Sequence, residues 1–524
     1  MVLKLLENLS EIQIGESLKK FKDGFLKSER YWIIYLILVV IVSLVAFNVI
    51  NYKFPFKEII GISIVAIFGI IAISFYSSHD SNEELYKTAF VIIILFGLLC
   101  CFINPICNVS DETEHLARAD LTSQGILFPE YINESYMVSD EISSFFIVEK
   151  SHTVFEVTGD TEPINTTLAP FSSAFQQNPF FGYIPQGIGV AIAKLLNLNT
   201  IWMLWLARVF NLLWYASLIS YAVKKTPILK IPTIAMACIP VAIQQGASAS
   251  IDATFIGLGI VTIAYFFYML KSEDGTIENK EILIFSLLSL LLGMTKLPFL
   301  AIILLLVCVP ESKFKESNYR AFIILGVLAV IILGLIWTSY SMPNYLHSWR
   351  AGHNAKGNID SKKQIMFMIA HPLQGLISIF HIPNSLGKKP VLTALATIYT
   401  TSGKTRLLDN GFLNPVVLMF FGALTFFYPN TDDTEIKQRV GPLITGVIIY
   451  AGVCLTQIIS WAPIGKLNHL VVHTRYFLPL FVLLPFVFGM NHVEKRDYNV
   501  DSYVIMLTVG FVSAFLIKMI ATFY

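Results

Sequence analysis

The sequence has little charge and no excess of either sign. Asp, Glu, Lys and Arg make up 14% of its 524 residues, and the formal net charge at pH 7 is +1. Nucleic-acid-binding proteins usually carry a clear basic excess, so we expect no nucleic-acid partner. Hydrophobic residues reach 55% and the mean hydropathy is +0.66. This usage is far from that of soluble domains and predicts an all-α integral membrane protein.

Cysteine is also scarce, with six residues in the chain. Five of them lie in apolar runs and only Cys107 lies near a loop, so no disulfide framework or zinc spacing is present. A cleavable signal is not expected either, because a mixed polar segment with several lysines precedes the first apolar run. Residues 1–31 are therefore predicted to be a cytoplasmic N-terminal segment that forms a partly amphipathic helix.

Long apolar runs dominate the rest of the chain. A membrane-spanning helix needs about 20 mainly apolar residues. On this basis we predict about 13 spans, within a range of 11 to 14, because the apolar segments 364–382 and 390–401 can lie on the bilayer or dip into it. The predicted spans lie near 32–50, 57–77, 88–106, 200–222, 230–248, 252–270, 281–296, 298–311, 320–340, 411–428, 440–462, 475–490 and 502–522.

Basic residues in short loops indicate how the spans are oriented. They all fall on one side of the predicted spans, together with the N-terminus: Lys224, Lys225, Lys230, Lys271, Lys280, Lys313, Lys315, Arg320, Lys437, Arg439, Lys495 and Arg496. Short cytoplasmic loops are enriched in Lys and Arg, so this side is predicted to be cytoplasmic in a multi-pass protein of the cell membrane. Counting spans then places two long loops, 107–199 and 341–410, on the extracytoplasmic side.

The order of these segments predicts five regions. Residues 1–31 precede an added helix pair at 32–87, and a transmembrane module at 88–340 contains the large first loop. Residues 341–410 form a second loop with interfacial helices, and 411–524 hold the C-terminal spans. The first loop is acidic and the second is basic. Either the two loops face each other across a cleft, or each is a solvated surface.

Ionisable residues gather at the start of the first loop, in the stretch "DETEHLAR". Asp111 and Glu114 have the spacing of a capping box at a helix start, which is a purely structural role. Asp111, His115 and Arg118 share one face of that helix, and Glu112 lies at its edge. A carboxylate, an imidazole and a guanidinium together can accept a proton from a hydroxyl, hold a metal or bind a phosphate.

Further charges lie at the predicted outer ends of the spans. They are Arg208, Asp252, Lys296 and Arg475. A charge near the bilayer is costly, so it usually faces a cavity or a partner. Structural pairing, for instance of Asp252 with Lys296, is the alternative to a functional role.

Five segments in order resemble a large, poorly characterised bacterial family of integral membrane proteins. The resemblance covers about residues 88–490 and rests on "NVSDETEHLARADLTSQG", "NPFFGYIPQGIGVAIAKLLNLNTIWMLWLARVFNLLWY", "CIPVAIQQGASASIDATFIGLGI", "LLLGMTKLPFLAIILL" and "HTRYFLPLF". Members share an Asp-Glu-x-x-His-x-x-Arg block, a Ser-x-Asp and a late Arg-Tyr-Phe-x-Pro. One departure is Thr474, where the family often has Gly before the Arg. That family is in turn similar to GT-C glycosyltransferases.

The resemblance implies a GT-C-like transferase that moves a sugar from a polyprenyl-phosphate donor to a cell-envelope glycan, such as a polysaccharide or teichoic acid. It implies Asp111 as general base on the acceptor hydroxyl, with Glu112 as the second candidate. The expected substrate-binding residues are His115, Arg118, Arg208, Asp252, Lys296, Arg475 and Tyr476. A lipid phosphate needs a cation as it leaves, ideally a bidentate Arg. The sequence requires no cofactor and leaves a divalent cation open.

Two other classes of function fit the same composition. A transporter or flippase of polysaccharide or lipid also places charges near a membrane cavity, and a non-catalytic subunit of an envelope-assembly complex uses its loops to bind partners. Transporters often show internal repeats and broken helices near the membrane midplane. Here no repeat is visible and the charges gather at one face, which favours surface chemistry.

Overall fold

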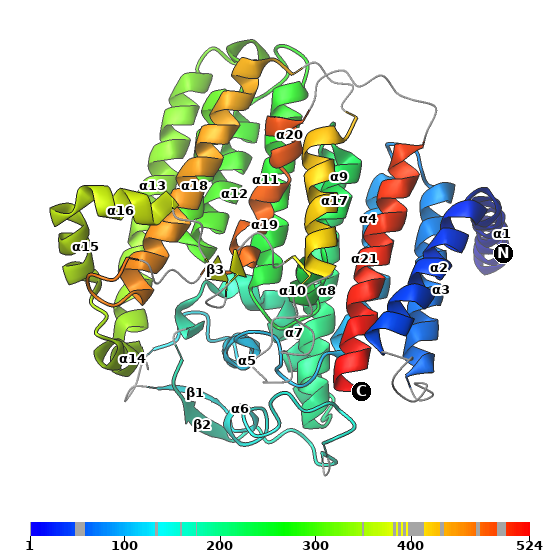
Figure 1. The fold of residues 1–524 in the computed structure, drawn as a ribbon, viewed down its shortest axis with the longest axis horizontal. Coiled ribbons are helices and arrows are strands. Elements are labelled where there is room, and N and C mark those ends of the chain that lie inside the picture. The colour runs from blue at the N-terminus through cyan, green and yellow to red at the C-terminus, as the bar shows by residue number, and fades with distance from the viewer. Residues whose placement is uncertain are drawn as a thin grey trace.

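A computed structural model describes residues 2–47, 58–130, 135–157, 160–173, 175–347, 350–380, 384–385, 389–390, 395–396, 413–429, 434–467, 472–489 and 499–524. Most of these residues are helical, and long helices run side by side in a bundle (Figure 1). Eight described helices are long and apolar enough to cross a membrane: Glu29–Ala46, Ile59–Ser78, Leu85–Ile103, Thr200–Lys225, Asp252–Lys271, Tyr319–Met342, Ile436–Trp461 and Val500–Phe523. The predicted all-α membrane architecture is confirmed at this level.

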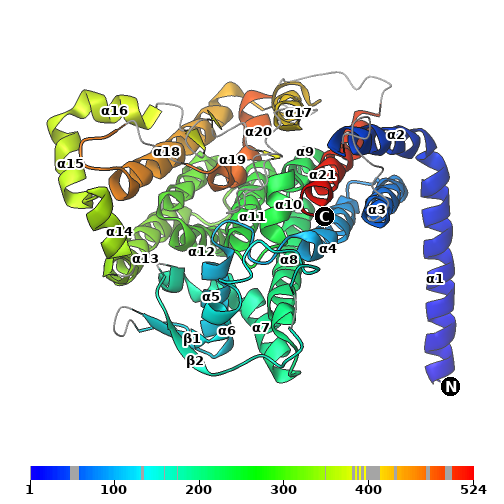
Figure 2. The ribbon, with the colours of Figure 1, turned by 60° about the horizontal axis from the view of Figure 1, so that its bottom comes forward.

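The N-terminal region packs against the last helix of the chain. Helix α1 (Val2–Lys27) projects from the bundle, whereas α2 (Glu29–Ala46) and α3 (Ile59–Ser78) lie beside α21 (Val500–Phe523) (Figures 1 and 2). The buried Tyr35 hydroxyl donates to the Val65 carbonyl at 2.8 Å and lies 2.9 Å from the Ser513 hydroxyl. These bonds join three helices, so the predicted N-terminal pair is attached to the C-terminal part of the bundle.

Helix α11 (Asp252–Lys271) lies at the centre of the bundle. It contacts α8 (Thr200–Lys225), which in turn packs on α4 (Leu85–Ile103). Of the most apolar 18-residue stretch of α11, 94% is buried inside the protein. Because this helix is enclosed on nearly all sides, its first residue, Asp252, is held in a fixed position.

The segment around Lys296 is a hairpin of two unlike helices. Helix α12 (Asn279–Thr295) has 17 residues and the 3-10 helix η3 (Leu297–Cys308) has 12. A rise of about 1.5 Å per residue in an α-helix and about 2.0 Å in a 3-10 helix gives both arms a length of about 25 Å. Lys296, which is extended between them, therefore lies at the tip of the hairpin.

Two other predicted spans are broken at prolines. Residues 230–248 form α9 (Lys230–Ala237) and α10 (Pro240–Gly246). Residues 475–490 form η7 (Thr474–Phe477), α19 (Leu478–Phe481) and α20 (Leu484–Phe488). Pro240, Pro479 and Pro485 each occupy a first turn, where the missing N–H costs little, and each ends the preceding helix.

The count of 13 spans therefore stays a prediction. The five predicted spans outside the eight long helices are the two broken segments, α12, η3 and the 15-residue α17 (Leu413–Phe427). Hydropathy registers the apolar runs in these segments but not their helix type or their breaks. The remaining long helices, α13 (Tyr319–His347) and α18 (Ile436–Trp461), match the predicted spans 320–340 and 440–462.

The first loop folds as a small unit at one end of the bundle (Figure 1). Strands β1 (Tyr136–Ser139) and β2 (Leu168–Phe171) pair antiparallel, with Tyr136 opposite Phe171. Around them lie the helical elements α5 (Glu112–Ser123), α6 (Glu141–Ser144), η1 (Phe175–Gln177), η2 (Phe180–Tyr183) and α7 (Ile184–Leu195). Their apolar residues form a core that continues into the start of α8. The loop is thus rigidly attached to the spans.

The second loop begins with three short helices, α14 (Arg350–Gly357), α15 (Ser361–Ala370) and α16 (Pro372–Phe380), followed by the two-residue strands β3 (Asn384–Ser385) and β4 (Lys389–Pro390). Helices α15 and α16 contact α18, and α16 exposes Leu373, Leu376 and Ile377. An exposed apolar face on a short helix is typical of an interfacial helix, and the predicted interfacial position stays a prediction. Most of the predicted apolar segment 390–401 lies outside the described residues.

Candidate functional site

A cluster of charged side chains lies where the first loop meets the bundle. Asp252 is the first residue of α11, Lys296 lies at the tip of the α12–η3 hairpin, Arg475 is in η7, and Asp111 immediately precedes α5. Four separate segments thus bring two carboxylates and two cations together. We name these four residues the charge cluster.

Asp252 is at the centre of the charge cluster. Its Oδ1 lies 3.2 Å from Lys296 Nζ and its Oδ2 lies 3.0 Å from Arg475 Nε. Arg475 Nη2 also donates to Asp111 Oδ2 at 3.1 Å. The side chains of Asp252 and Arg475 are each 3% exposed, whereas that of Asp111 is 41% exposed. The cluster is therefore buried around Asp252 and open at Asp111.

The backbone of Asp111 explains why its carboxylate reaches Arg475. Asp111 has φ 64° and ψ 15°, which is the left-handed region, and its side chain accepts no hydrogen bond from α5. An N-cap residue that caps with its side chain usually has extended backbone angles. The predicted capping box is therefore wrong, and the carboxylate takes part in the charge cluster instead.

Aromatic rings surround the two cations. Lys296 Nζ lies 4.3 Å from the ring centre of Tyr476 and 4.8 Å from that of Phe255. The Arg475 guanidinium carbon lies 5.6 Å from the same Tyr476 ring. Cations are attracted to aromatic faces at such distances, more strongly where water is excluded. Tyr476 thus contacts both cations of the cluster.

His115 is a buried imidazole that is hydrogen-bonded to Tyr183. Asn178 Nδ2 donates to the Tyr183 hydroxyl at 2.9 Å, and that hydroxyl lies 2.6 Å from His115 Nδ1. Burial lowers the pKa of His115 to about 4, although Asp252 and Asp111 act in the opposite direction. At neutral pH the ring is therefore uncharged and offers one N–H donor and one acceptor nitrogen.

Glu114 is a second carboxyl group beside Asp111. Burial raises the pKa of Glu114 to about 6, with the nearby Asp111 charge acting in the same direction and Ser173 against it. Its Oε2 is buried and has no hydrogen-bond partner among the described residues. Asp111 and Glu114, three positions apart, therefore have contrasting surroundings, one exposed and paired with Arg475, the other desolvated.

Glu112 and Arg208 form a fully buried pair beneath the cluster. Arg208 Nε and Nη2 bind the two Glu112 oxygens at 2.8 and 2.7 Å, and its other N–H groups donate to the carbonyls of Cys101, Asn104 and Pro105. Glu112 Oε1 also accepts from the Ala249 N–H at 3.1 Å. Apart from the pair itself, these hydrogen bonds all go to backbone groups. They fix the chain just before Asp111 and at Ala249, three residues before Asp252.

Arg118 lies away from the charge cluster. Its guanidinium donates to Thr122 Oγ1 and to the Leu127 carbonyl, each at 2.9 Å, and to the Asn178 carbonyl at 3.3 Å. It therefore ties α5 to two turns of the first loop. The structure assigns Arg118 no contact with the other predicted site residues.

The structure thus brings six of the predicted residues together and separates three. The charge cluster contains Asp111, Asp252, Lys296 and Arg475. Tyr476 contacts both of its cations, and His115 lies within the electrostatic influence of its carboxylates. Glu112, Arg208 and Arg118 position the backbone around it. The predicted alternative of Asp252–Lys296 pairing is present as one contact within this larger network.

Three neighbours of the site were not predicted as such. Glu114 was interpreted only as a cap, and Tyr183 and His473 carried no sequence signal beyond their place in the quoted segments. The His473 ring packs edge-on against Tyr476, and burial together with the Arg475 charge lowers the pKa of His473 to about 3. Thr474 is not among the residues with positive φ, so the turn before Arg475 does not require Gly.

The described residues contain no group of three or more His, Cys, Asp and Glu side chains placed to hold a metal ion. The two carboxylates of the charge cluster are instead neutralised by Lys296 and Arg475. Charge compensation in the site is therefore built from the chain's own cations.

Comparison with known proteins gives one family. No curated protein and no solved structure matches the sequence significantly. The family model described as "Predicted membrane protein (DUF2142)" matches residues 94–484, which include every residue of the charge cluster. Because the match covers about three quarters of the chain, this protein belongs to the DUF2142 family of membrane proteins.

Proposed function

We propose that the protein is a membrane glycosyltransferase that moves a sugar from a polyprenyl-phosphate donor to a hydroxyl of a cell-envelope glycan. One observation carries the proposal: an exposed carboxylate, Asp111, is paired with Arg475 at the end of a bundle of apolar helices. The second carboxylate on Arg475, that of Asp252, also binds Lys296, so two cations lie in the same cluster. The reaction needs a general base for the acceptor hydroxyl and cations that bind the donor phosphate, close together at a membrane surface.

In the proposed reaction, Asp111 removes the proton from the acceptor hydroxyl. The oxygen forms a bond to the anomeric carbon, the bond from that carbon to the phosphate oxygen breaks, and polyprenyl phosphate leaves with the electron pair. A sugar hydroxyl is a poor nucleophile, and a positioned general base contributes roughly 10²- to 10⁴-fold. The 41% exposure of Asp111 gives an acceptor access to it.

Arg475 and Lys296 serve the departing phosphate. Negative charge develops on that group as the bond breaks, and fixed cations in a partly dry site stabilise such charge strongly. Asp252 contacts both cations and holds them close together. His115, as a neutral donor, is suited to bind an uncharged oxygen of the sugar rather than to act as a base.

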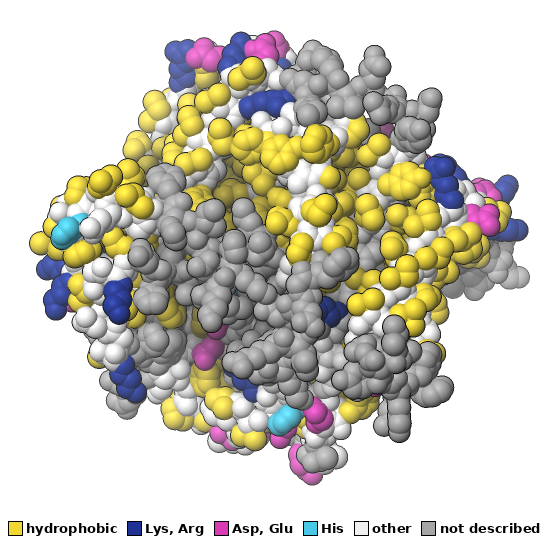
Figure 3. Space-filling model, in the orientation of Figure 1, with side chains coloured by type: hydrophobic (Ala, Val, Ile, Leu, Met, Phe, Trp, Pro, Cys, Tyr) yellow, Lys and Arg dark blue, Asp and Glu magenta, His cyan; other side chains and the backbone are white. Residues whose placement is uncertain are grey.

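The arrangement of apolar and charged surface supports a lipid-linked donor and an extracytoplasmic site. Hydrophobic side chains cover much of the bundle face in Figure 3, and charged ones gather towards its edges. At the end opposite Asp111, Lys230 Nζ contacts the Asn82 carbonyl and Lys224 lies over the Tyr86 ring, and Lys315 pairs with Glu278. Basic residues favour the cytoplasmic side, so the charge cluster would face outwards.

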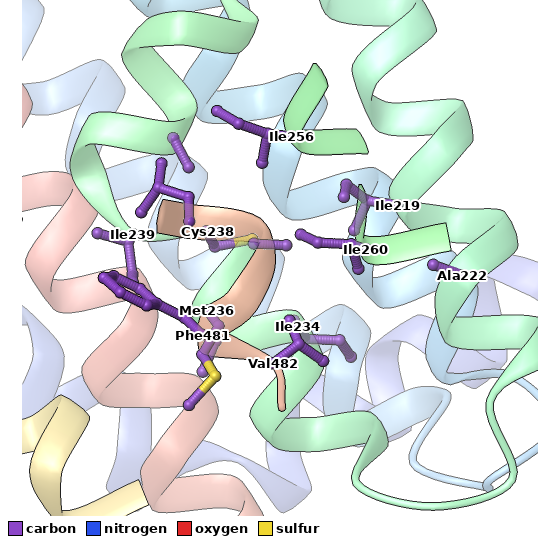
Figure 4. Close-up of a cluster of buried hydrophobic side chains, with 14 of the residues drawn as sticks. Ile219, Ala222, Ile234, Met236, Cys238, Ile239, Ile256, Ile260, Phe481 and Val482 are labelled. Atoms are coloured by element: carbon purple, nitrogen blue, oxygen red, sulfur yellow. The ribbon is translucent and has the colours of Figure 1, made fainter. Parts of the chain in front are cut away.

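Transport is the second candidate, because two of the helical segments are broken. Transporters bind charged substrates and ions at the exposed ends of such half-helices. Here the breaks are lined by buried apolar side chains, among them Cys238, Ile239, Phe481 and Val482 (Figure 4). The charge cluster lies instead at the end of the bundle, where the first loop meets the spans. Surface chemistry fits this arrangement better than passage through the breaks.

Transfer by purified protein is the direct test. Protein in lipid nanodiscs would be incubated with polyprenyl-phosphate donors carrying labelled sugars and with envelope glycan acceptors. We expect transfer by the parent and by Glu162→Gln, which removes an exposed charge from the same loop, and loss of at least about 100-fold in Asp111→Asn. Transfer at the parental rate by Asp111→Asn would remove Asp111 as the base. No transfer from any donor in nanodiscs, together with donor movement across the bilayer of closed proteoliposomes, would favour the flippase.

A further inference from the structure

We propose that Asp111 and the donor phosphate compete for Arg475, so that donor binding releases the base. This inference rests on the proposed function and concerns the order of events at the same site. In the structure the Arg475 Nη2 group is bound to Asp111 Oδ2 at 3.1 Å. The carboxylate thus occupies a position at which an incoming phosphate oxygen would accept the same hydrogen bond.

The two carboxylates on Arg475 are not equally easy to displace. Asp252 is 3% exposed and contacts both Arg475 and Lys296, so its displacement would take from both cations the carboxylate that they share. Asp111 is 41% exposed and forms an ion pair with Arg475 through one oxygen. An ion pair that is open to water on one side is screened more than a fully buried one. An anionic ligand would therefore displace Asp111 and leave Asp252 in place.

Phosphate is suited to this exchange. It offers several acceptor oxygens to the guanidinium, whereas Asp111 contributes one oxygen. Once phosphate is bound, Asp111 and the phosphate are like charges on the same side of Arg475 and repel each other. The carboxylate then turns towards the open side, where an acceptor hydroxyl can reach it.

The exchange makes the base available only in the presence of donor. Without donor, Asp111 is held by Arg475 and is a poor proton acceptor for the hydroxyl. With donor bound, the same cation stabilises the leaving group. When polyprenyl phosphate departs, Asp111 returns to Arg475. Donor is thus expected to bind before the acceptor is activated.

The left-handed backbone at Asp111 allows this competition to be tested without unfolding the protein. Asn and Gly are the residues that adopt φ near +60° most readily, so Asp111→Asn and Asp111→Gly both remove the charge and keep the turn. The native side chain makes no hydrogen bond to α5 that either variant would lose. Glu162→Gln is the matched control, because it removes one negative charge from the same loop at an exposed position.

The measurement is binding of sugar-free polyprenyl phosphate to protein in neutral-lipid nanodiscs, with inorganic phosphate in a parallel series. We expect both Asp111 variants to bind the lipid about threefold to tenfold more tightly than the parent, from loss of a weak ion pair and of like-charge repulsion. Glu162→Gln should bind like the parent. Unchanged or weaker binding in both Asp111 variants would overturn the competition.

The two phosphate sources and the two proposals give separable results. Tighter binding of inorganic phosphate without tighter binding of the lipid would overturn the assignment of a lipid ligand. Sugar transfer by the parent, with no gain in lipid binding by the variants, would sink the competition and leave the transferase intact. A gain in lipid binding in a protein that transfers no sugar would support the competition and refute the transferase.

Discussion

At the scale of single residues, the site separates two carboxyl groups that are three positions apart. Asp111 is exposed and paired with Arg475, whereas Glu114 is largely buried and its pKa is raised to about 6. Neighbouring carboxyls with contrasting surroundings often have different roles in proton transfer. The contrast gives Glu114 a pH dependence that can be measured independently of function.

Glu114→Gln is expected to stabilise the protein at pH 7.5 and to have no effect at pH 4.5. The pKa in the folded protein is above its ordinary value, so the folded state binds the proton more tightly than the unfolded chain does. Ionisation of Glu114 therefore lowers the free energy of unfolding as the pH rises from about 4.5 to 6. The loss is about 2 kcal/mol, because the pKa is raised from 4.5 to about 6. Melting temperatures in detergent at both pH values would check it, and an equal gain at both would contradict it.

Arg475→Lys is expected to lower donor use substantially, and Arg475→Ala to lower it further. Lysine keeps the charge but loses the planar fork by which Arg475 contacts Asp111 and Asp252 together. Single-turnover rates at saturating donor would measure the effect. If both variants transfer sugar at the parental rate, Arg475 is a structural anchor, and the donor phosphate must be bound by the basic second loop.

At the scale of elements, the long apolar helices were predictable and the irregular ones were not. The runs that became α4, α8, α11 and α21 were located because length and hydropathy are sufficient for a regular span. The same criteria cannot tell that 12 residues after Lys296 form a 3-10 helix, or that Pro240 and Pro479 divide their spans. Those outcomes depend on packing between distant segments.

The candidate site was predictable as residues and not as an arrangement. Asp111, Asp252, Lys296 and Arg475 were recognisable as costly charges near span ends. The ion pair between Asp111 and Arg475 joins positions 364 residues apart, a separation that local spacing does not reveal. Glu112 is the second candidate for the base at the level of sequence, because the sequence does not show that both its oxygens are bound to Arg208.

The Glu112–Arg208 pair predicts a large effect on stability. In Glu112→Gln the Arg208 charge stays buried without its counter-charge, which typically costs about 3 to 5 kcal/mol. Thermal unfolding in detergent should show a clear loss. The matched control is Glu311→Gln, whose partner Arg320 is bound by two similar contacts at an exposed position and should lose little. Equal losses in both variants would contradict the assigned structural role.

At the scale of the whole molecule, the first and second loops lie at the same end of the bundle. Phe128 of the first loop packs edge-on against Tyr340 near the end of α13. The short links that carry Lys313 and Lys315 lie at the other end of α12 and η3. This polarity makes the predicted orientation testable by labelling from one side.

Impermeant thiol reagents should modify Glu162→Cys in intact cells and leave Ser312→Cys unmodified until the membrane is opened. Both positions are exposed, and they lie in the first loop and beside Lys313, respectively. The background would carry Ser in place of Cys107 and Cys308, the native thiols nearest the two positions. The expectation follows from the enrichment of lysine on the cytoplasmic side. If only Ser312→Cys is labelled in intact cells, the predicted orientation is wrong and the opposite one holds.

The long separation of Asp111 and Arg475 in the sequence also has a consequence for biogenesis. Chains are made from the N-terminus, so Asp252 and Lys296 can pair early, whereas Arg475 enters the membrane after most of the helices. Until then Asp252 lacks one of its two cations and Asp111 has no counter-charge in the cluster. The charge cluster is therefore completed in one of the last steps of assembly. A nascent chain interrupted before η7 has inserted helices but an incomplete site with an excess of negative charge.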